Sequence, residues 1–388
     1  MNSPIKIIIF TFLLSVIQNI KAFSISNHSF YKSNESRLKY TFDSSNGGHN
    51  LKVISLASLP NGYLASGSYD NTLKIWDIQN AKLKFNLDVI KGGHTSYVKA
   101  IEPLENGYIA SGSFDTSIKI WDISNGRLIK TFYNSDWVWL LVGLDNGDLV
   151  SASRDGKLKI WDVSNGVLKF NFDQNNGGHT ELIRSLVKLE NGYLASGSDD
   201  NTIKIWDLIN GKIVYTFDKS NGGHTNNVDK LVLLENGELA SGSYDNTIKL
   251  WDIKNGLLKY TFDSTNGGHS NIVVGLVSLK NGYLASGSYD FDIKIWDVNN
   301  RKLKFTFNRE NNGHNSYIEQ LFSLRNGYLA SGDRLGIIKI WDIDNEKVKY
   351  IFDKSNGGHS SFIEAFAELE NGLLASGSGD NTIKIWDI

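Results

Sequence analysis

The stretch that decides the fold is YIASGSFDTSIKIWD, residues 108–122. Residues 108–113 and 117–123 each predict a short β-strand, because β-branched, aromatic and small residues fill them without helical periodicity. Asp115 and Thr116 are residues that favour a turn between the two strands. The stretch therefore predicts a hairpin whose second strand ends in the pair Trp121-Asp122.

Two more strands are expected just before this hairpin. Residues 82–87 alternate in polarity, glycines and His94 then break the chain, and residues 97–104 predict a second strand. Asn106-Gly107 predicts a tight turn into the hairpin, because both residues tolerate positive φ. Strands that are apolar on both faces need cover on both sides, which a sheet stacked between two other sheets would have.

This four-strand unit repeats along the chain. Eight Trp-Asp pairs are spaced by 45, 40 and then five times 45 residues, at Trp76, Trp121, Trp161, Trp206, Trp251, Trp296, Trp341 and Trp386. A Gly-His pair precedes seven of them, with histidines at His49, His94, His179, His224, His269, His314 and His359. Such a fixed period is the signature of a repeat architecture, and eight units account for the chain after about residue 37.

The repeat resembles the WD40 family, which shares the Gly-His pair, the turn aspartate, the closing Trp-Asp and a period of roughly 40–45 residues. The resemblance implies an all-β, closed β-propeller of eight four-stranded blades. The last unit ends at Ile388 after its third strand, whereas residues 37–42 resemble the outermost strand at residues 258–262. We expect this N-terminal strand to pair with the last blade and close the ring, which would protect the sheet edges. The alternative is a fragment of a longer array.

The resemblance also implies an internal hydrogen-bond network of His94, Asp115, Ser111 and Trp121. A rival interpretation treats each histidine and its aspartate as a catalytic dyad or a pair of metal ligands. Structure needs one such pair in every blade, whereas catalysis needs one site with a nucleophile and an oxyanion hole. We therefore expect no catalytic residue, no metal and no cofactor.

Two units break the pattern. The third lacks the Gly-His pair and is five residues shorter, and the seventh has Leu335 at the position of the turn aspartate, with Asp333 two residues earlier. Both blades are expected to lose part of the network. Drift in a redundant array and a functional cause remain open alternatives for these irregularities.

Positions that vary between the repeats point to a binding face. By resemblance they lie on the narrow face around the central channel, and they are rich in aromatic and arginine residues, which anchor interfaces. The candidate partner-binding residues are Tyr97, Phe114, Trp137, Trp139, Arg154, Arg184, Tyr244, Tyr289, Tyr317 and Phe362. Trp137 and Trp139 are the only tryptophans outside the Trp-Asp pairs. Either one of them fills the space of the missing histidine, or both form a docking site beside a notch left by the short loop.

The composition and the N-terminal segment bound the environment. The chain has 388 residues, 40 Lys and Arg against 42 Asp and Glu, and no cysteine, which excludes disulfides and gives no global reason to expect nucleic acid. Residues 1–22, with Lys6, an apolar run and Ala22, predict a cleaved secretory signal. Residues 23–36 form a polar linker with glycosylation sequons at Asn27 and Asn34, and residues 37–388 form the propeller. The alternatives are a cytoplasmic protein, or an uncleaved membrane anchor.

We therefore expect a secreted, monomeric, non-catalytic ring that binds a protein or peptide on its narrow face. The mature chain is expected to have no membrane span and no nucleic-acid partner. The alternative function is a secreted carbohydrate-binding propeller, because aromatic faces stack on sugars. A recently amplified array with no selected partner is a further interpretation.

Overall fold

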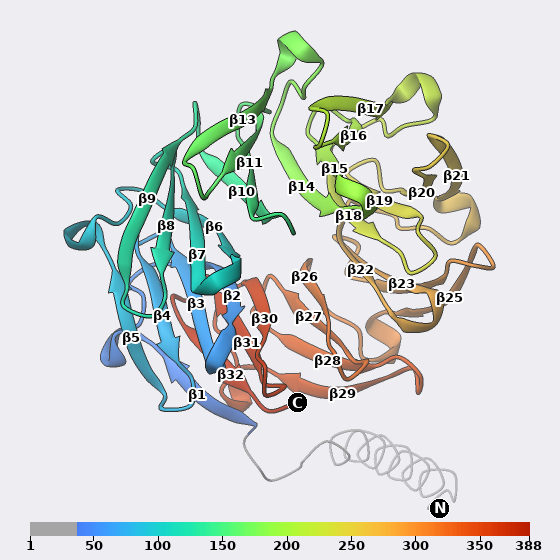
Figure 1. The fold of residues 1–388 in the computed structure, drawn as a ribbon. Helices are drawn as coiled ribbons and strands as arrows, with labels where there is room; N and C mark the ends of the chain where they lie inside the picture. The colour runs from blue at the N-terminus through green and yellow to red at the C-terminus, as the bar shows by residue number, and fades with distance from the viewer. Residues whose placement is uncertain (1–36) are drawn as a thin grey trace, which may run out of the picture. The chain divides into compact units, whose positions relative to one another are not determined.

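The computed structural model describes residues 37–388, apart from the side chain of Asn106. The predicted signal (1–22) and linker (23–36) lie outside the described residues. From Leu38 to Ile388 the chain forms one unit of eight four-stranded sheets, and all the strand pairs in the sheets are antiparallel (Figure 1). Among residues 37–388, no helix is long and apolar enough to cross a membrane.

Each sheet is one blade of a propeller, and seven blades consist of four consecutive strands. Blades one to four contain β2 (Val53–Leu59), β3 (Tyr63–Ser68), β4 (Leu73–Asp77), β5 (Lys82–Leu87); β6 (Val98–Pro103), β7 (Tyr108–Ser113), β8 (Ser117–Asp122), β9 (Arg127–Tyr133); β10 (Val138–Gly143), β11 (Asp148–Ser153), β12 (Leu158–Asp162), β13 (Val167–Phe172); and β14 (Ile183–Lys188), β15 (Tyr193–Ser198), β16 (Ile203–Asp207), β17 (Lys212–Phe217). Blades five to eight contain β18 (Val228–Leu233), β19 (Leu239–Ser243), β20 (Ile248–Asp252), β21 (Leu257–Phe262); β22 (Val273–Ser278), β23 (Tyr283–Ser288), β24 (Ile293–Asp297), β25 (Lys302–Phe307); β26 (Ile318–Ser323), β27 (Leu329–Asp333), β28 (Ile338–Asp342), β29 (Lys347–Phe352); and β30 (Ile363–Glu368), β31 (Leu374–Ser378), β32 (Ile383–Trp386) with β1 (Leu38–Phe42).

Short 3₁₀ turns connect many of the strands. They are η1 (Ser44–Asn46), η2 (Pro60–Gly62), η3 (Val89–Lys91), η4 (Glu105–Gly107), η5 (Gln174–Asn176), η6 (Glu190–Gly192), η7 (Lys219–Asn221), η8 (Ser264–Asn266), η9 (Lys280–Gly282), η10 (Arg309–Asn311) and η11 (Lys354–Asn356). Seven of them (η1, η3, η5, η7, η8, η10 and η11) lie between the outermost strand of one blade and the innermost strand of the next. The strand bounds predicted for the second unit agree with β5 and β7, and those for β6 and β8 differ by one residue at the ends.

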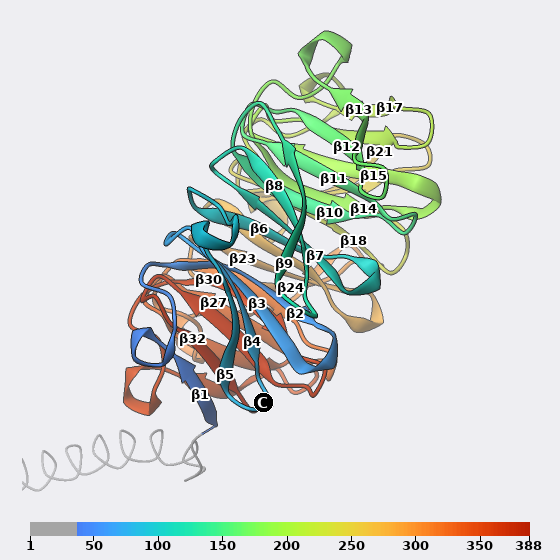
Figure 2. The same ribbon diagram turned by 60° about the vertical axis from the view of Figure 1, so that its left-hand side comes forward.

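The blades close into a ring. Each first strand contacts the first strand of the next blade, and β30 of the last blade contacts β2 of the first. In Figure 1 the first strands line the centre and the fourth strands lie at the outside, and Figure 2 turns the outer strands β5 and β9 toward the viewer. The predicted closure is confirmed, because β1 pairs with β32 in the register Thr41↔Lys384 and Phe42↔Ile383 and completes the eighth sheet.

The hydrophobic core lies between the blades. Each layer contains the Trp of one Trp-Asp pair packed with an outer-strand residue of the preceding blade, which is a phenylalanine in seven layers and Leu87 in the layer of Trp121. At the seam, Phe42 of β1 stacks on Trp76 of the first blade with ring centroids 4.5 Å apart, beside Ile383 of the last blade. Each blade is covered on both faces by its neighbours. The apolar faces of the first and last blades are therefore buried only if the ring is closed.

Candidate docking face

A capped turn sets the position of each repeat histidine. In the first unit the Asp43 carboxylate accepts a hydrogen bond from the Ser45 amide, and the Asn46 side chain accepts one from the Asp43 amide. Gly47 then adopts φ +87°, which favours glycine. A Cβ at Gly48 would lie 2.4 Å from the Asp43 carbonyl carbon, so this position also requires glycine. The motif therefore brings the chain back sharply and directs His49 into the blade.

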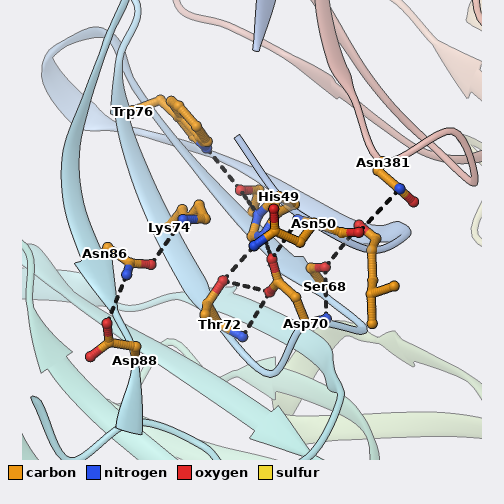
Figure 3. A network of polar contacts seen from close by, with 12 residues as sticks. His49, Asn50, Ser68, Asp70, Thr72, Lys74, Trp76, Asn86, Asp88 and Asn381 are labelled. Carbon is orange, nitrogen blue, oxygen red and sulfur yellow. Dashed lines mark hydrogen bonds and ion pairs between the residues drawn. The ribbon is translucent and has the colours of Figure 1, made fainter. Parts of the chain in front are cut away.

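His49 links the loop to the turn between β3 and β4 (Figure 3). Its Nδ1 lies 2.9 Å from Asp70 Oδ2, and its Nε2 lies 2.7 Å from Ser66 Oγ. The indole nitrogen of Trp76 donates to the same serine oxygen at 2.8 Å. Thr72 donates to the other carboxylate oxygen of Asp70 at 2.6 Å.

The electrostatics of the network keep the imidazole of His49 neutral and the carboxyl group of Asp70 ionised. Burial lowers the pKa of His49 and outweighs the hydrogen bond to Asp70, so the imidazole is neutral at pH 7. Burial raises the pKa of Asp70, but hydrogen bonds from His49, Thr72 and the Asn50 amide outweigh it and hold that pKa well below its usual range. A neutral imidazole then donates from Nδ1 to Asp70 and accepts at Nε2 from the Ser66 hydroxyl. Every polar hydrogen of the chain from tryptophan to aspartate thus has an acceptor.

The second blade contains the same arrangement at the residues proposed from the sequence. His94 Nδ1 lies 2.9 Å from Asp115 Oδ2, and His94 Nε2 lies 2.7 Å from Ser111 Oγ. Trp121 donates to Ser111 Oγ at 2.9 Å. The network ties the loop before β6 to the turn after β7, and these two segments carry the variable residues Tyr97 and Phe114.

The seventh blade keeps the contact between its histidine and a carboxylate. Asp333, which replaces a strand serine and is fully buried, lies 2.9 Å from His314 Nδ1 through its Oδ2. Ser331 contacts His314 Nε2 at 2.6 Å and accepts from Trp341 at 2.8 Å. The blade loses only part of the network, as expected, because a carboxylate two residues earlier reaches the same imidazole. The missing member is the hydroxyl of Thr72, whose counterpart is Ile337.

The third blade does lose the histidine, and Asn134 takes its position. Asn134 donates to Ser151 at 3.2 Å, and Trp161 donates to the same oxygen at 2.9 Å. The Oδ1 atom of Asn134 is buried without a hydrogen-bond partner. Neither Trp137 nor Trp139 fills the space, and no 3₁₀ turn separates β9 from β10. The two tryptophans are half-buried and contact Phe114 instead.

Seven variable side chains form a continuous row over blades eight, one, two and three, which we call the ladder. Its members in order are Phe362, Lys52, Tyr69, Tyr97, Phe114, Trp137 and Arg154. Tyr69 and Tyr97 stack with centroids 4.1 Å apart and planes 2° apart, and Phe114 stacks on Trp137 at 4.3 Å and 6°.

One cation, Arg154, ends the ladder on blade three, and the other, Lys52, lies between the rings of Phe362 and Tyr69. The Arg154 guanidinium lies over Trp137 at 4.4 Å, and Lys52 Nζ lies 4.6 Å from the centre of the Phe362 ring. Gly379 leaves room for the Phe362 ring, because a Cβ on residue 379 would lie 2.8 Å from that ring. Trp139 extends the ladder inward, 5.7 Å from Phe114 and 5.1 Å from Lys99 Nζ.

The remaining candidates lie in two separate clusters on blades four to seven. Arg184 forms ion pairs with Asp199 and with Asp229, the latter at 3.5 Å, and its guanidinium lies 5.3 Å from the Tyr244 ring. The ring centroids of Tyr289 and Tyr317 lie 4.5 Å apart. Arg334 lies over both of these rings and pairs with Glu319 at 2.7 Å.

The structure thus groups six of the ten candidates in the ladder and its inward extension: Tyr97, Phe114, Trp137, Trp139, Arg154 and Phe362. It adds Lys52, Tyr69 and Lys99 to them. Tyr69 stands just before the turn aspartate of its blade, as Phe114 does, so this position could have identified it. Within residues 37–388, no three His, Asp or Glu side chains are arranged to hold a metal ion.

Comparison with known proteins agrees with the geometry. The family model described as "WD domain, G-beta repeat" matches residues 37–77, 86–122, 126–162, 171–207, 211–252, 258–297, 302–342 and 353–387. The crystal structure of the computationally designed Ika8 protein is similar, with a TM-score of 0.75 and 29% identity, covering 88% of this chain and 98% of that chain. No curated protein matches the chain. Because the matched repeats cover most of its length, the chain belongs to the WD40 family of β-propellers.

Proposed function

We propose that the chain is a non-catalytic interaction scaffold that binds a protein or peptide partner on the face carrying the turn aspartates, the narrow face in this family. WD40 propellers are typically protein-interaction scaffolds. The observation that carries the proposal for this face is the ladder, which gathers five aromatic side chains and two cations across four blades. Aromatic and arginine side chains dominate the binding energy of interfaces.

The scaffold beneath supports this role. The networks of His49 and His94 hold the loops and turns that carry Lys52, Tyr69, Tyr97 and Phe114, and both histidines are buried and hydrogen-bonded at both ring nitrogens. A surface that is ordered before binding loses little conformational entropy when a partner docks. The ladder is only partly buried, with Tyr97 36% exposed, so it has contact area left for a partner.

The carbohydrate-binding alternative is less well supported. A sugar stacks on an open aromatic face, whereas Tyr69, Tyr97, Phe114 and Trp137 each have a face covered by a stacked neighbour. Arg154 also lies over Trp137. This arrangement favours a partner that contacts ring edges and cations over one that stacks on rings.

The test is the double replacement Trp137→Ala with Trp139→Ala in the full chain. Partners are captured with the unmodified chain. The affinity of one purified partner is then measured for the unmodified chain and for the double variant. The proposal expects affinity to fall at least about tenfold, because anchor residues are costly to truncate. A matched control removes Tyr63 and Tyr108 (Tyr63→Ala with Tyr108→Ala), which start β3 and β7 at the opposite end of the strands. Unchanged affinity in a folded ladder variant, or an equal loss in the control, contradicts the proposal.

A further inference from the structure

The charges on the docking face are distributed unevenly between its two halves. On blades four to seven the arginines are neutralised within the ring, because Arg184 pairs with Asp199 and Asp229 and Arg334 pairs with Glu319. On the ladder half, Lys52, Lys99 and Arg154 contact aromatic rings instead. Among residues 37–388, none of these three cations has a carboxylate oxygen within 4.0 Å of its side-chain nitrogens.

The carboxylates near these cations are engaged by other groups. Asp70 and Asp115 accept hydrogen bonds from His49 and His94, and Asp155 pairs with Lys157 at 2.7 Å. Glu364 lies close enough to Lys99 and Lys52 for attraction. Burial raises the pKa of Glu364 and lowers the pKa of Lys99, so it disfavours the charged form of both groups. Asp136 accepts a hydrogen bond from the Trp137 amide at 2.7 Å and is thus engaged by its own backbone. Lys52, Lys99 and Arg154 thus make no salt bridge within the described part of the ring, whereas Arg184 and Arg334 on the other half do.

The ring geometry favours the same sign of partner charge. The quadrupole of an aromatic ring makes its face negative and its edge positive. Within the ladder, stacking covers one face each of Tyr69, Tyr97, Phe114 and Trp137, and the guanidinium of Arg154 lies over Trp137, so ring edges form part of the surface left for a partner. Positive edges alongside unpaired cations attract carboxylates and repel ammonium groups.

From this juxtaposition we propose that the ladder half of the face docks an acidic peptide segment of a partner protein. Its carboxylates pair with Lys52, Lys99 and Arg154, and it runs along the aromatic edges of blades one to three. The proposal rests on the proposed function and names the chemistry of the partner. Nucleic acid fits less well than peptide, because single strands bind by stacking bases on open aromatic faces.

The experiment is a selection of short random peptides displayed on phage against the immobilised full chain. The proposal expects the enriched peptides to contain more aspartate and glutamate than the starting library. It also expects the affinity of a purified selected peptide to fall at least about tenfold in the variant Lys52→Glu with Arg154→Glu, and to weaken as salt is raised.

The matched control is Lys254→Glu with Lys302→Glu, the same charge change at exposed lysines on the opposite end of the strands, and affinity should stay unchanged there. Thermal unfolding confirms that each variant is folded. Peptides without an acidic excess, no enrichment at all, or binding that survives the ladder charge reversal overturn the proposal. Equal competition by a single-stranded oligonucleotide also overturns it.

The outcomes separate this inference from the proposed function. Neutral or basic peptides whose binding depends on Trp137 and Trp139 would show a docking face with another preference. Peptides whose binding depends on neither the tryptophans nor the cations would contradict both proposals.

Discussion

At the scale of residues, the strand serine is the centre of each blade network. Ser111 Oγ accepts from Trp121 and contacts His94 Nε2, so one hydroxyl serves two buried groups. Its small volume matters as well, because the neighbouring strands bring the indole and the imidazole to 2.9 and 2.7 Å from the same atom. The sequence could predict this network, because its four residue types recur at fixed spacing in nearly every repeat.

Replacement of this serine should destabilise the ring. We predict that Ser111→Ala lowers the free energy of unfolding by roughly 2–4 kcal/mol, because two buried polar groups lose their partner. Ser124→Ala removes a hydroxyl that bonds Asp122 in an exposed turn and should cost less than about 1 kcal/mol. Denaturant unfolding of the two variants measures the difference, and equal losses would contradict the assigned role of Ser111.

The histidines predict a pH dependence of stability. Burial lowers the pKa of six of them: His49, His94, His179, His224, His314 and His359. The unfolded chain takes up protons at these residues below about pH 6.5 while the folded chain does not, so the unfolded state binds more protons there. The free energy of unfolding should therefore fall as pH is lowered from about 7.5 to about 5.5.

Equilibrium unfolding at both pH values checks this sign. The variant His94→Asn, which copies the residue of the third blade, should show a shallower fall because one titrating group is gone. A stability that rises or stays level on acidification would show that the histidines are not held neutral.

At the scale of elements, the seventh blade shows what pattern matching misses. The repeat places an aspartate at the turn, and Leu335 at that position suggested a broken network. The imidazole is reached instead from the end of β27, because Asp333 lies on the strand that also carries Ser331. A one-dimensional alignment cannot show that two positions on one hairpin reach the same nitrogen.

Because Asp333 takes the role of the turn aspartate, an aspartate restored at residue 335 should rescue the stability lost when Asp333 is replaced. Asp333→Ser should lower the free energy of unfolding by about 1–3 kcal/mol, because it leaves the Nδ1 group of His314 buried without its acceptor. The double variant Asp333→Ser with Leu335→Asp restores the arrangement of the other blades and should recover most of the loss. Chemical denaturation of both variants is the measurement, and a double variant no more stable than the single one would refute this explanation.

The third blade shows a different limit of sequence reasoning. Asn134 stands 17 residues before Ser151, as each histidine stands 17 residues before its serine, so its place in the network was visible in the sequence. The role of Trp137 was not, since it depends on the Phe114 ring of the preceding blade. Contacts between blades depend on the stacking of whole sheets, which the repeat pattern does not specify.

At the scale of the whole molecule, closure and the docking face depend on each other. The ladder crosses the seam of the ring, because Phe362 belongs to the loop before β30 and Lys52 to the loop before β2. Asn381 also donates to the Asn50 carbonyl across this seam at 3.2 Å, as Figure 3 shows. The sequence of the two terminal segments predicted the closure. The order of the ladder members could not be predicted, because it depends on which blades are neighbours in the closed ring.

A disulfide between β1 and β32 tests this closed ring most directly. Thr41 and Lys384 are register partners, and directly paired residues lie within the Cα separation that a disulfide requires. The chain has no cysteine, so Thr41→Cys with Lys384→Cys introduces the only two thiols. The matched control joins Thr41→Cys to Lys249→Cys, the corresponding lysine of the fifth blade, whose partner is Thr261. We predict that the first pair oxidises within one molecule, as shown by mass spectrometry, and that the control pair stays reduced. Failure of the first pair to form the bond, or equal oxidation of both, would contradict the closed eight-bladed ring and with it the ladder.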